Sequence, residues 1–249
     1  MRLLPGLLCG LLLAPPPPAA AQTASQDSIL ALARRWLGPA TLERLQSLRA
    51  VAAVKGPRGP IQTVIRSRLA GLTRFEQFDD RGPLFIAGVG RRGPWTWSVR
   101  EARADTLSAA GASVITGHEF HLLVAYPERR WTPRDSARLE VAEGDTLWRL
   151  EFTDRLGAPV AVRYAQDGRP VDLLLVNHSG TGSPEVRVRV FDWPADEPRL
   201  FRYAVILHGS DTWLYHYLML EPDSASTAVF EPSPPVDGPK RREREEGCP

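Results

Sequence analysis

Three short motifs carry residues that could do chemistry. His118-Glu119-Phe120-His121 places two histidines three residues apart, so on a helix both imidazoles would share one face and could hold a metal ion. The pattern supplies no third ligand, although His178, His208 or His216 could reach the site through the fold. We therefore expect no metal site, and we interpret the two histidines as partly exposed side chains near a helix start.

The other two motifs lack the structural context that their chemistry needs. His178-Ser179 lies in a glycine-rich stretch that reaches Ser183, but neighbours in sequence do not form a catalytic triad, and no G-x-S-x-G elbow is present. Gly88–Gly93 spells G-x-G-x-x-G, yet Pro94-Trp95-Thr96-Trp97 continues it as a strand, where a dinucleotide site requires a helix. We predict a flexible loop and a hairpin turn, with no enzyme activity and no cofactor.

Helices are expected near the start and in the middle of the chain. Residues 29–37 have apolar side chains at helical spacing, with Asp27 or Ser28 as the cap and Gly38-Pro39 as the end. A short helix over residues 40–48 follows, and residues 116–130 also fit the helical period. The remaining chain, from Leu48 onward, alternates with the period of strands joined by short turns, which requires antiparallel pairing.

The two ends of the chain differ from its body. Residues 1–21 read as a secretory signal peptide, with Arg2, an apolar run over residues 3–14 and the small residues Ala19-Ala20-Ala21. We expect no lipid anchor at Cys9, because it lies inside the apolar run. We assign residues 22–233 to one domain and residues 234–249, which are rich in proline and charge, to a disordered tail. Cys248 is then a free thiol of that tail.

Composition limits the classes of function. The 249 residues are 43% hydrophobic and 24% charged, which excludes a disordered, collagen-like or multi-span membrane protein. The net charge is +2, and no basic field over the body favours nucleic acid. We expect an exported, periplasmic monomer that does not span a membrane.

Two strands are apolar on both faces. Residues 173–176 are Leu-Leu-Leu-Val, and residues 213–220 are apolar or aromatic with one histidine. Two interpretations remain open: both faces are covered by protein, or the second face binds an apolar ligand.

The order of elements resembles that of the bacterial outer-membrane lipoprotein-sorting carriers (LolA-like in the broad sense). The stretches that carry the resemblance are Pro39–Leu45 in the second helix and Trp148–Phe152 and Val188–Trp193 in the strands. The resemblance covers about residues 28–233. It implies a mainly β α+β fold, in which helices cover the concave face of a strongly curved, open antiparallel sheet like half a barrel. It also implies a lipid or lipoprotein acyl chain held between sheet and helices, without cofactor or catalysis.

Under this resemblance, the apolar strands line the ligand site. The expected lining residues are Trp148, Phe152, Val162, Leu173, Val188, Val205, Trp213 and Tyr215. The carriers have an Arg-Pro pair early in the sheet whose arginine contacts the helical lid. Here Arg66-Ser67-Arg68-Leu69 lacks the proline, so Arg66 or Arg68 would take that role.

The sequence thus predicts a non-catalytic envelope protein that binds a lipid or acyl chain and acts as a carrier, with an envelope protein as a further partner. One alternative is a periplasmic scaffold of the same fold without a ligand. A second alternative is a small hydrolase or metalloenzyme that uses the histidines.

Overall fold

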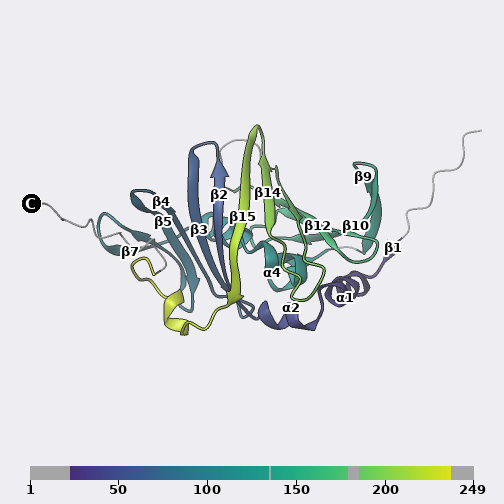
Figure 1. Ribbon diagram of the computed structural model, residues 1–249, viewed down its shortest axis with the longest axis horizontal. Helices are drawn as coiled ribbons and strands as arrows, with labels where there is room; N and C mark the ends of the chain where they lie inside the picture. Colours follow the sequence, from purple (N-terminus) through teal and green to yellow (C-terminus); the bar gives the residue numbers. More distant parts are fainter. Residues whose placement is uncertain (1–22, 135, 179–184, 237–249) are drawn as a thin grey trace, which may run out of the picture.

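The chain folds into one long antiparallel β-sheet accompanied by short helices (Figure 1). The computed structural model describes residues 23–134, 136–178 and 185–236. The helices are α1 (Gln26–Leu37), α2 (Pro39–Arg44), α3 (Ala109–Gly117), α4 (Phe120–Ala125) and the 3-10 turns η1 (Pro127–Arg129) and η2 (Thr227–Phe230). The strands are β1 (Thr23–Ala24), β2 (Ser47–Gly56), β3 (Gly59–Arg68), β4 (Thr73–Asp79), β5 (Gly82–Gly90), β6 (Gly93–Ser98), β7 (Arg103–Thr106), β8 (Thr132–Pro133), β9 (Ala137–Ala142), β10 (Asp145–Thr153), β11 (Pro159–Ala165), β12 (Pro170–Val176), β13 (Glu185–Phe191), β14 (Tyr203–His208) and β15 (Asp211–Pro222).

The sheet is open, as the sequence predicts. Its order is β1-β9-β10-β11-β12-β13-β14-β15-β2-β3-β4-β5-β6-β7, with β8 beside β10, and the end strands β1 and β7 do not pair with each other. The two halves of the chain meet where β15 pairs with β2, with Tyr215 opposite Val54 and Leu220 opposite Ala50. The end of the folded chain thus pairs with its beginning in the middle of the sheet.

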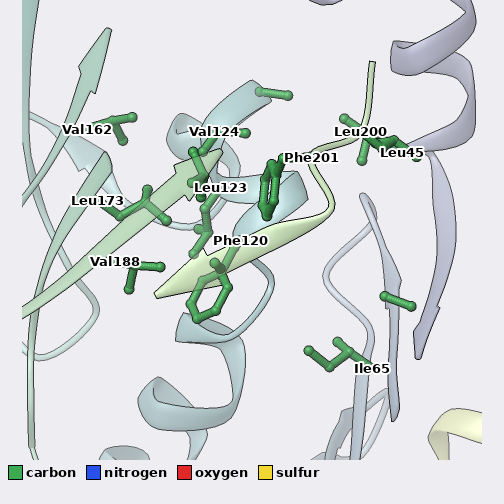
Figure 2. Packing of buried hydrophobic residues seen from close by; sticks show 14 of the residues in the cluster. Leu45, Ile65, Phe120, Leu123, Val124, Val162, Leu173, Val188, Leu200 and Phe201 are labelled. Carbon is green, nitrogen blue, oxygen red and sulfur yellow. The ribbon is translucent and has the colours of Figure 1, made fainter. Parts of the chain in front are cut away.

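Alternate side chains along each strand define two faces of the sheet. We call the inner face the one that carries the buried apolar cluster, and the outer face the opposite one. Residues of α3 and α4, such as Ile115 and Phe120, belong to the same cluster as the inner-face residues of the sheet. Figure 2 shows labelled members of this cluster from strands of both halves of the sheet and from α4: Ile65, Phe120, Leu123, Val124, Val162, Leu173 and Val188.

Local sequence fixes where α1 begins. Ser25 Oγ accepts a hydrogen bond from the Ser28 amide at 3.1 Å, so the cap is Ser25 and the helix starts at Gln26. The predicted caps Asp27 and Ser28 lie inside the first turn, because the chain becomes helical before its apolar period begins. Gly38, at φ 83°, ends the helix as predicted, and Pro39 opens α2.

The predicted helix over residues 116–130 is broken into three pieces. The helix α3 begins earlier, capped by Ser108 through the Gly111 amide at 3.1 Å, and ends at Gly117. The chain leaves the helical conformation at Glu119 and resumes it in α4, and η1 starts at Pro127. The break turns the Glu119 carboxylate toward Arg130, whose Nε donates to Glu119 Oε2 at 2.6 Å.

The hairpin that the sequence predicts at Gly88–Gly93 is present. Gly90 pairs with Gly93 between β5 and β6, so G-x-G-x-x-G forms a hairpin with strands on both sides. Gly168, at φ 93°, lies between β11 and β12, and a Cβ there would come within 2.8 Å of the Leu32 backbone of α1. Glycine is therefore required at that position both by conformation and by space.

A C-terminal strap, residues 223–236, lies across the outer face of β3–β6. Asp223 forms an ion pair with Arg66, and the Trp95 indole Nε1 donates to the Phe230 carbonyl at 2.8 Å. Among the described residues, the strap ends at Val236, whose amide donates to Glu76 Oε1 at 3.0 Å. Packing therefore continues past residue 233, where the predicted domain ended. The predicted signal peptide (1–21), residues 179–183 of the predicted loop, Cys9 and Cys248 lie outside the described residues.

Candidate ligand cavity

A large cavity lies against the inner face of the sheet. Its volume is about 1390 Å³, and this includes open space at the ends of the strands as well as the interior. The part inside the fold is bordered by side chains of α3, the start of α4 and strands β3 and β11–β15. Its apolar lining there includes Ile61, Val114, Phe120, Trp131, Val160, Leu175, Val186, Val188, Ile206, Trp213 and Tyr215.

The cavity reaches the ends of the strands. The turns β2–β3 and β4–β5 border it with Arg58 and with residues 79–81, and β14–β15 with His208 and Asp211. Several further lining residues belong to the outer face by register, so the volume includes space around the strand ends as well as the interior. Among them are Ala53, Pro60, Gln62, Phe78 and Val176.

Three of the predicted lining residues border the cavity: Val188, Trp213 and Tyr215. Four other predicted residues lie on the inner face but do not line the cavity. Trp148 packs against the core, and the other three are fully buried: Phe152, Val162 and Leu173. Val205 lies on the outer face, because it alternates with the inward Ala204 and Ile206 and pairs with Leu214. Whether any of these residues contacts a ligand stays a prediction.

Side chains of α3 and α4 form a part of the cavity wall that the strand pattern did not predict. Val114, Gly117 and His118 of the α3 region line it together with Phe120. The available signal was the run of small and apolar residues over 109–117, which has no charged side chain and so favours a helix packed against the rest of the fold.

His118 lies in the part of the cavity wall that α3 and α4 form. Its ring centroid lies 4.9 Å from that of Phe75, 5.6 Å from Phe120 and 6.1 Å from Tyr215. Its Nδ1 is 2.8 Å from the Val114 carbonyl oxygen. Burial lowers the pKa of His118, so the ring is neutral near pH 7.

His121 and Glu119 make their contacts within the buried core. The His121 ring stacks on Phe201 with centroids 3.8 Å apart, and Nε2 donates to the Phe201 carbonyl at 2.9 Å. Glu119 receives hydrogen bonds from Arg130 and from Thr73 Oγ1, the latter at 2.7 Å. The two histidines therefore point to different partners, and among the described residues no group of three His, Cys, Asp or Glu side chains could hold a metal ion.

Polar pairs occupy the rim near β12. His178 Nε2 lies 2.5 Å from Asp154 Oδ2, while Asp154 Oδ1 accepts from the amides of Leu156 and Ala158, each at 2.9 Å. The His208 ring is 3.1 Å from the Asn177 amide nitrogen. These contacts connect the ends of β10, β12 and β14, and they place fixed polar groups beside the apolar interior.

Arg66 and Arg68, expected to contact a helical lid, hold the C-terminal strap. Arg66 pairs with Asp223, and Arg68 Nη2 donates to the Ala225 carbonyl at 2.5 Å while its guanidinium lies over the Phe230 ring. Both side chains belong to the outer face of β3, because the inner positions of that strand are Ile61, Thr63 and Ile65. The alternation of the strand thus directs them away from α3 and α4.

Across the part of the chain that the structure describes, no helix has the length and apolar character needed to cross a membrane.

Known proteins show similarity to this chain in structure only. No family model and no curated protein matches it. One similar solved structure is a provisionally named outer membrane lipoprotein-sorting protein domain from Vibrio parahaemolyticus, with TM-score 0.48, 10% identity and coverage of 82% of this chain and 96% of that chain. Another is a DUF1329 family protein from Desulfovibrio piger, with TM-score 0.49, 10% identity and the same two coverages, 82% and 96%.

Proposed function

We propose that this chain is an exported, non-catalytic envelope protein that holds the acyl chain of a lipid or lipoprotein between its sheet and its helices. The observation that carries the proposal is the apolar interior of the cavity, which lies against the inner face of the sheet. An acyl chain gains about 0.8 kcal/mol for each CH₂ group that it buries, so such a site needs hydrophobic walls more than polar motifs. Under this proposal, α3 and α4 cover the concave face of the sheet as a lid.

Export and carriage are supported by the sequence. Residues 1–21 have the pattern of a secretory signal, and a carrier in the periplasm would work as a soluble monomer that hands its cargo to an envelope partner. The polar rim with Asp154, Asn177 and His208 would face the headgroup side of the cargo.

The direct test is native mass spectrometry of the chain purified from a periplasm, followed by lipid extraction of the same sample. We expect an added mass of an acyl lipid that disappears on extraction. A bare mass, with no uptake of palmitate or of phospholipid when these are offered, would favour the scaffold alternative.

A blocking variant makes the test specific to the cavity. A Cβ built on Gly117 meets only Leu175 Cδ1, at 3.9 Å, so larger side chains there would grow into cavity space. We expect Gly117→Phe to lose most of the lipid adduct and the matched Gly117→Ala to keep it. Equal adducts on both variants would place the lipid elsewhere.

One observation favours the hydrolase as a second candidate. Asp154 orients His178 beside the cavity, as a carboxylate orients a general base. Turnover of a fatty-acyl ester that His178→Gln abolishes would support this function. No turnover above buffer would exclude it for that ester.

A further inference from the structure

The hydrogen bond of His118 to the backbone decides its tautomer. A carbonyl oxygen only accepts, so the contact of 2.8 Å to Val114 requires the proton on Nδ1. In the neutral ring, Nε2 then carries a lone pair and acts only as an acceptor. Burial keeps the ring neutral by lowering its pKa, and Nδ1 remains hydrogen-bonded to the Val114 carbonyl of α3.

The surroundings of His118 contrast with the polar rim. Charged lining residues of the cavity come from turns and strand ends: Arg58, Asp79, Asp80, Arg81, Asp154 and Asp211. His118 instead lies among the rings of Phe75, Phe120 and Tyr215. The residues that border the cavity thus include an imidazole with an acceptor nitrogen, beside aromatic rings.

Such an acceptor distinguishes ligands by what they carry along the chain. A hydroxyl group buried without a partner costs free energy, whereas one that donates to a fixed acceptor recovers that cost. A carboxylate or a phosphodiester has no proton to donate near pH 7, and a plain methylene has none at all. The matching group is a hydroxyl on the acyl chain.

We propose that the cavity prefers hydroxylated acyl chains, with His118 Nε2 accepting the hydrogen bond of the chain hydroxyl. This inference rests on the proposed function, since it assigns the cargo class of the same cavity. His118 acts as a specificity residue of the binding site and performs no catalysis.

A small second cavity suggests a different role for His118, which is to bind a water molecule. It holds about 10 Å³, borders His118 and Tyr217, and has room for about one water molecule. If Nε2 served only such a water, removal of the imidazole would not change ligand preference.

The test compares matched ligands on matched variants. Dissociation constants for palmitate and 3-hydroxypalmitate, and for stearate and 12-hydroxystearate, are measured near pH 8 by displacement of a fluorescent fatty acid. The proteins are wild type, His118→Phe, which removes the acceptor but keeps an aromatic ring, and the control His121→Phe. His121 does not line the large cavity, so its replacement should leave the preference unchanged.

We expect wild type and His121→Phe to share the same ratio of affinities within each ligand pair. For at least one pair, His118→Phe should shift that ratio about tenfold against the hydroxylated chain, as one lost buried hydrogen bond predicts. His118→Leu serves as the second variant if the phenylalanine prevents folding.

An unchanged ratio in both pairs, with all four chains still bound, would overturn the role of His118 and leave the acyl-binding function intact. If wild type bound none of the four chains, the proposed function and this inference would both be overturned.

Discussion

At the scale of single residues, Glu119 is the acid of the His118–His121 motif that the fold uses for stability. Its side chain and that of Arg130 are 0% and 3% exposed, and they are 2.6 Å apart. Glu119→Gln should lower the free energy of unfolding by about 3–5 kcal/mol, because it leaves the buried Arg130 cation without its counter-ion. Urea unfolding measures the loss.

A surface pair provides the control for Glu119. Arg103 and Glu101 are 2.5 Å apart with side chains 64% and 53% exposed, so Glu101→Gln should change stability by less than about 1 kcal/mol. If Glu119→Gln were as mild as Glu101→Gln, the carboxylate would not be compensating Arg130. A double variant that also replaces Arg130 by Met should recover part of the loss, because it removes the unpaired charge.

His121 predicts a dependence of stability on pH. Burial lowers its pKa from 6.5 to about 4, so the folded state resists a proton that the unfolded chain accepts. The contribution is complete above about pH 6.5 and is lost as pH falls toward 4, by about 3 kcal/mol in all.

His121→Phe lacks this titration, and the comparison isolates it. All other side chains are the same in both proteins, so their effects cancel in the difference between the two stability curves. Urea titrations between pH 7 and 4 should show wild type losing more stability than His121→Phe. Parallel curves would mean that folding does not lower the pKa of His121.

At the scale of elements, the C-terminal strap is predicted to be a part of the domain. Arg74, which is 1% exposed, donates from Nη1 to the Val229 carbonyl at 2.9 Å and from Nη2 to the Pro234 carbonyl at 2.6 Å. Ending the chain after Pro222 would expose the buried Arg74-Glu76 pair and remove Phe230, which is fully buried. We expect this truncation to fail to fold or to melt far below wild type.

Two further chains make the strap prediction testable even if that truncation does not fold. Phe230→Ala should cost about 3–5 kcal/mol through lost packing. A chain that ends after Val236 keeps all the described strap contacts and should melt like wild type. A normal melting temperature for the truncation after Pro222 would show that the strap adds nothing.

Strand positions were predictable from the sequence, but their faces were less so. Residues 148–152 alternate with a clear period of two, and this predicts β10 with its inner side. In β14 every residue from Tyr203 to Leu207 is apolar or aromatic, so alternation cannot tell Val205 from Ile206. The register with β15 decides that Val205 faces outward, and register is a property of the assembled sheet.

At the scale of the whole molecule, the cavity depends on contacts that are distant in sequence. Val114 and His118 come from the middle of the chain, Ile61 from β3, and Trp213 and Tyr215 from β15. The sequence predicted an apolar site from the resemblance, and Val188, Trp213 and Tyr215 do border the cavity. It could not place α3 there, because no local pattern states which face of the sheet a central helix packs against.

The cavity also predicts how the whole molecule responds to an acyl chain. A ligand that binds only the folded state stabilises it by about 2.7 kcal/mol at a free concentration of 100 times Kd. For a domain of this size, that shift raises the melting temperature by about 5–10 °C. Palmitate added to delipidated wild type and to Gly117→Ala should give this rise in a thermal unfolding scan, and Gly117→Phe should show little of it. A rise of equal size in Gly117→Phe would mean that palmitate stabilises the protein from a surface outside the cavity, because that variant fills the space beside Leu175 and leaves the outer face unchanged.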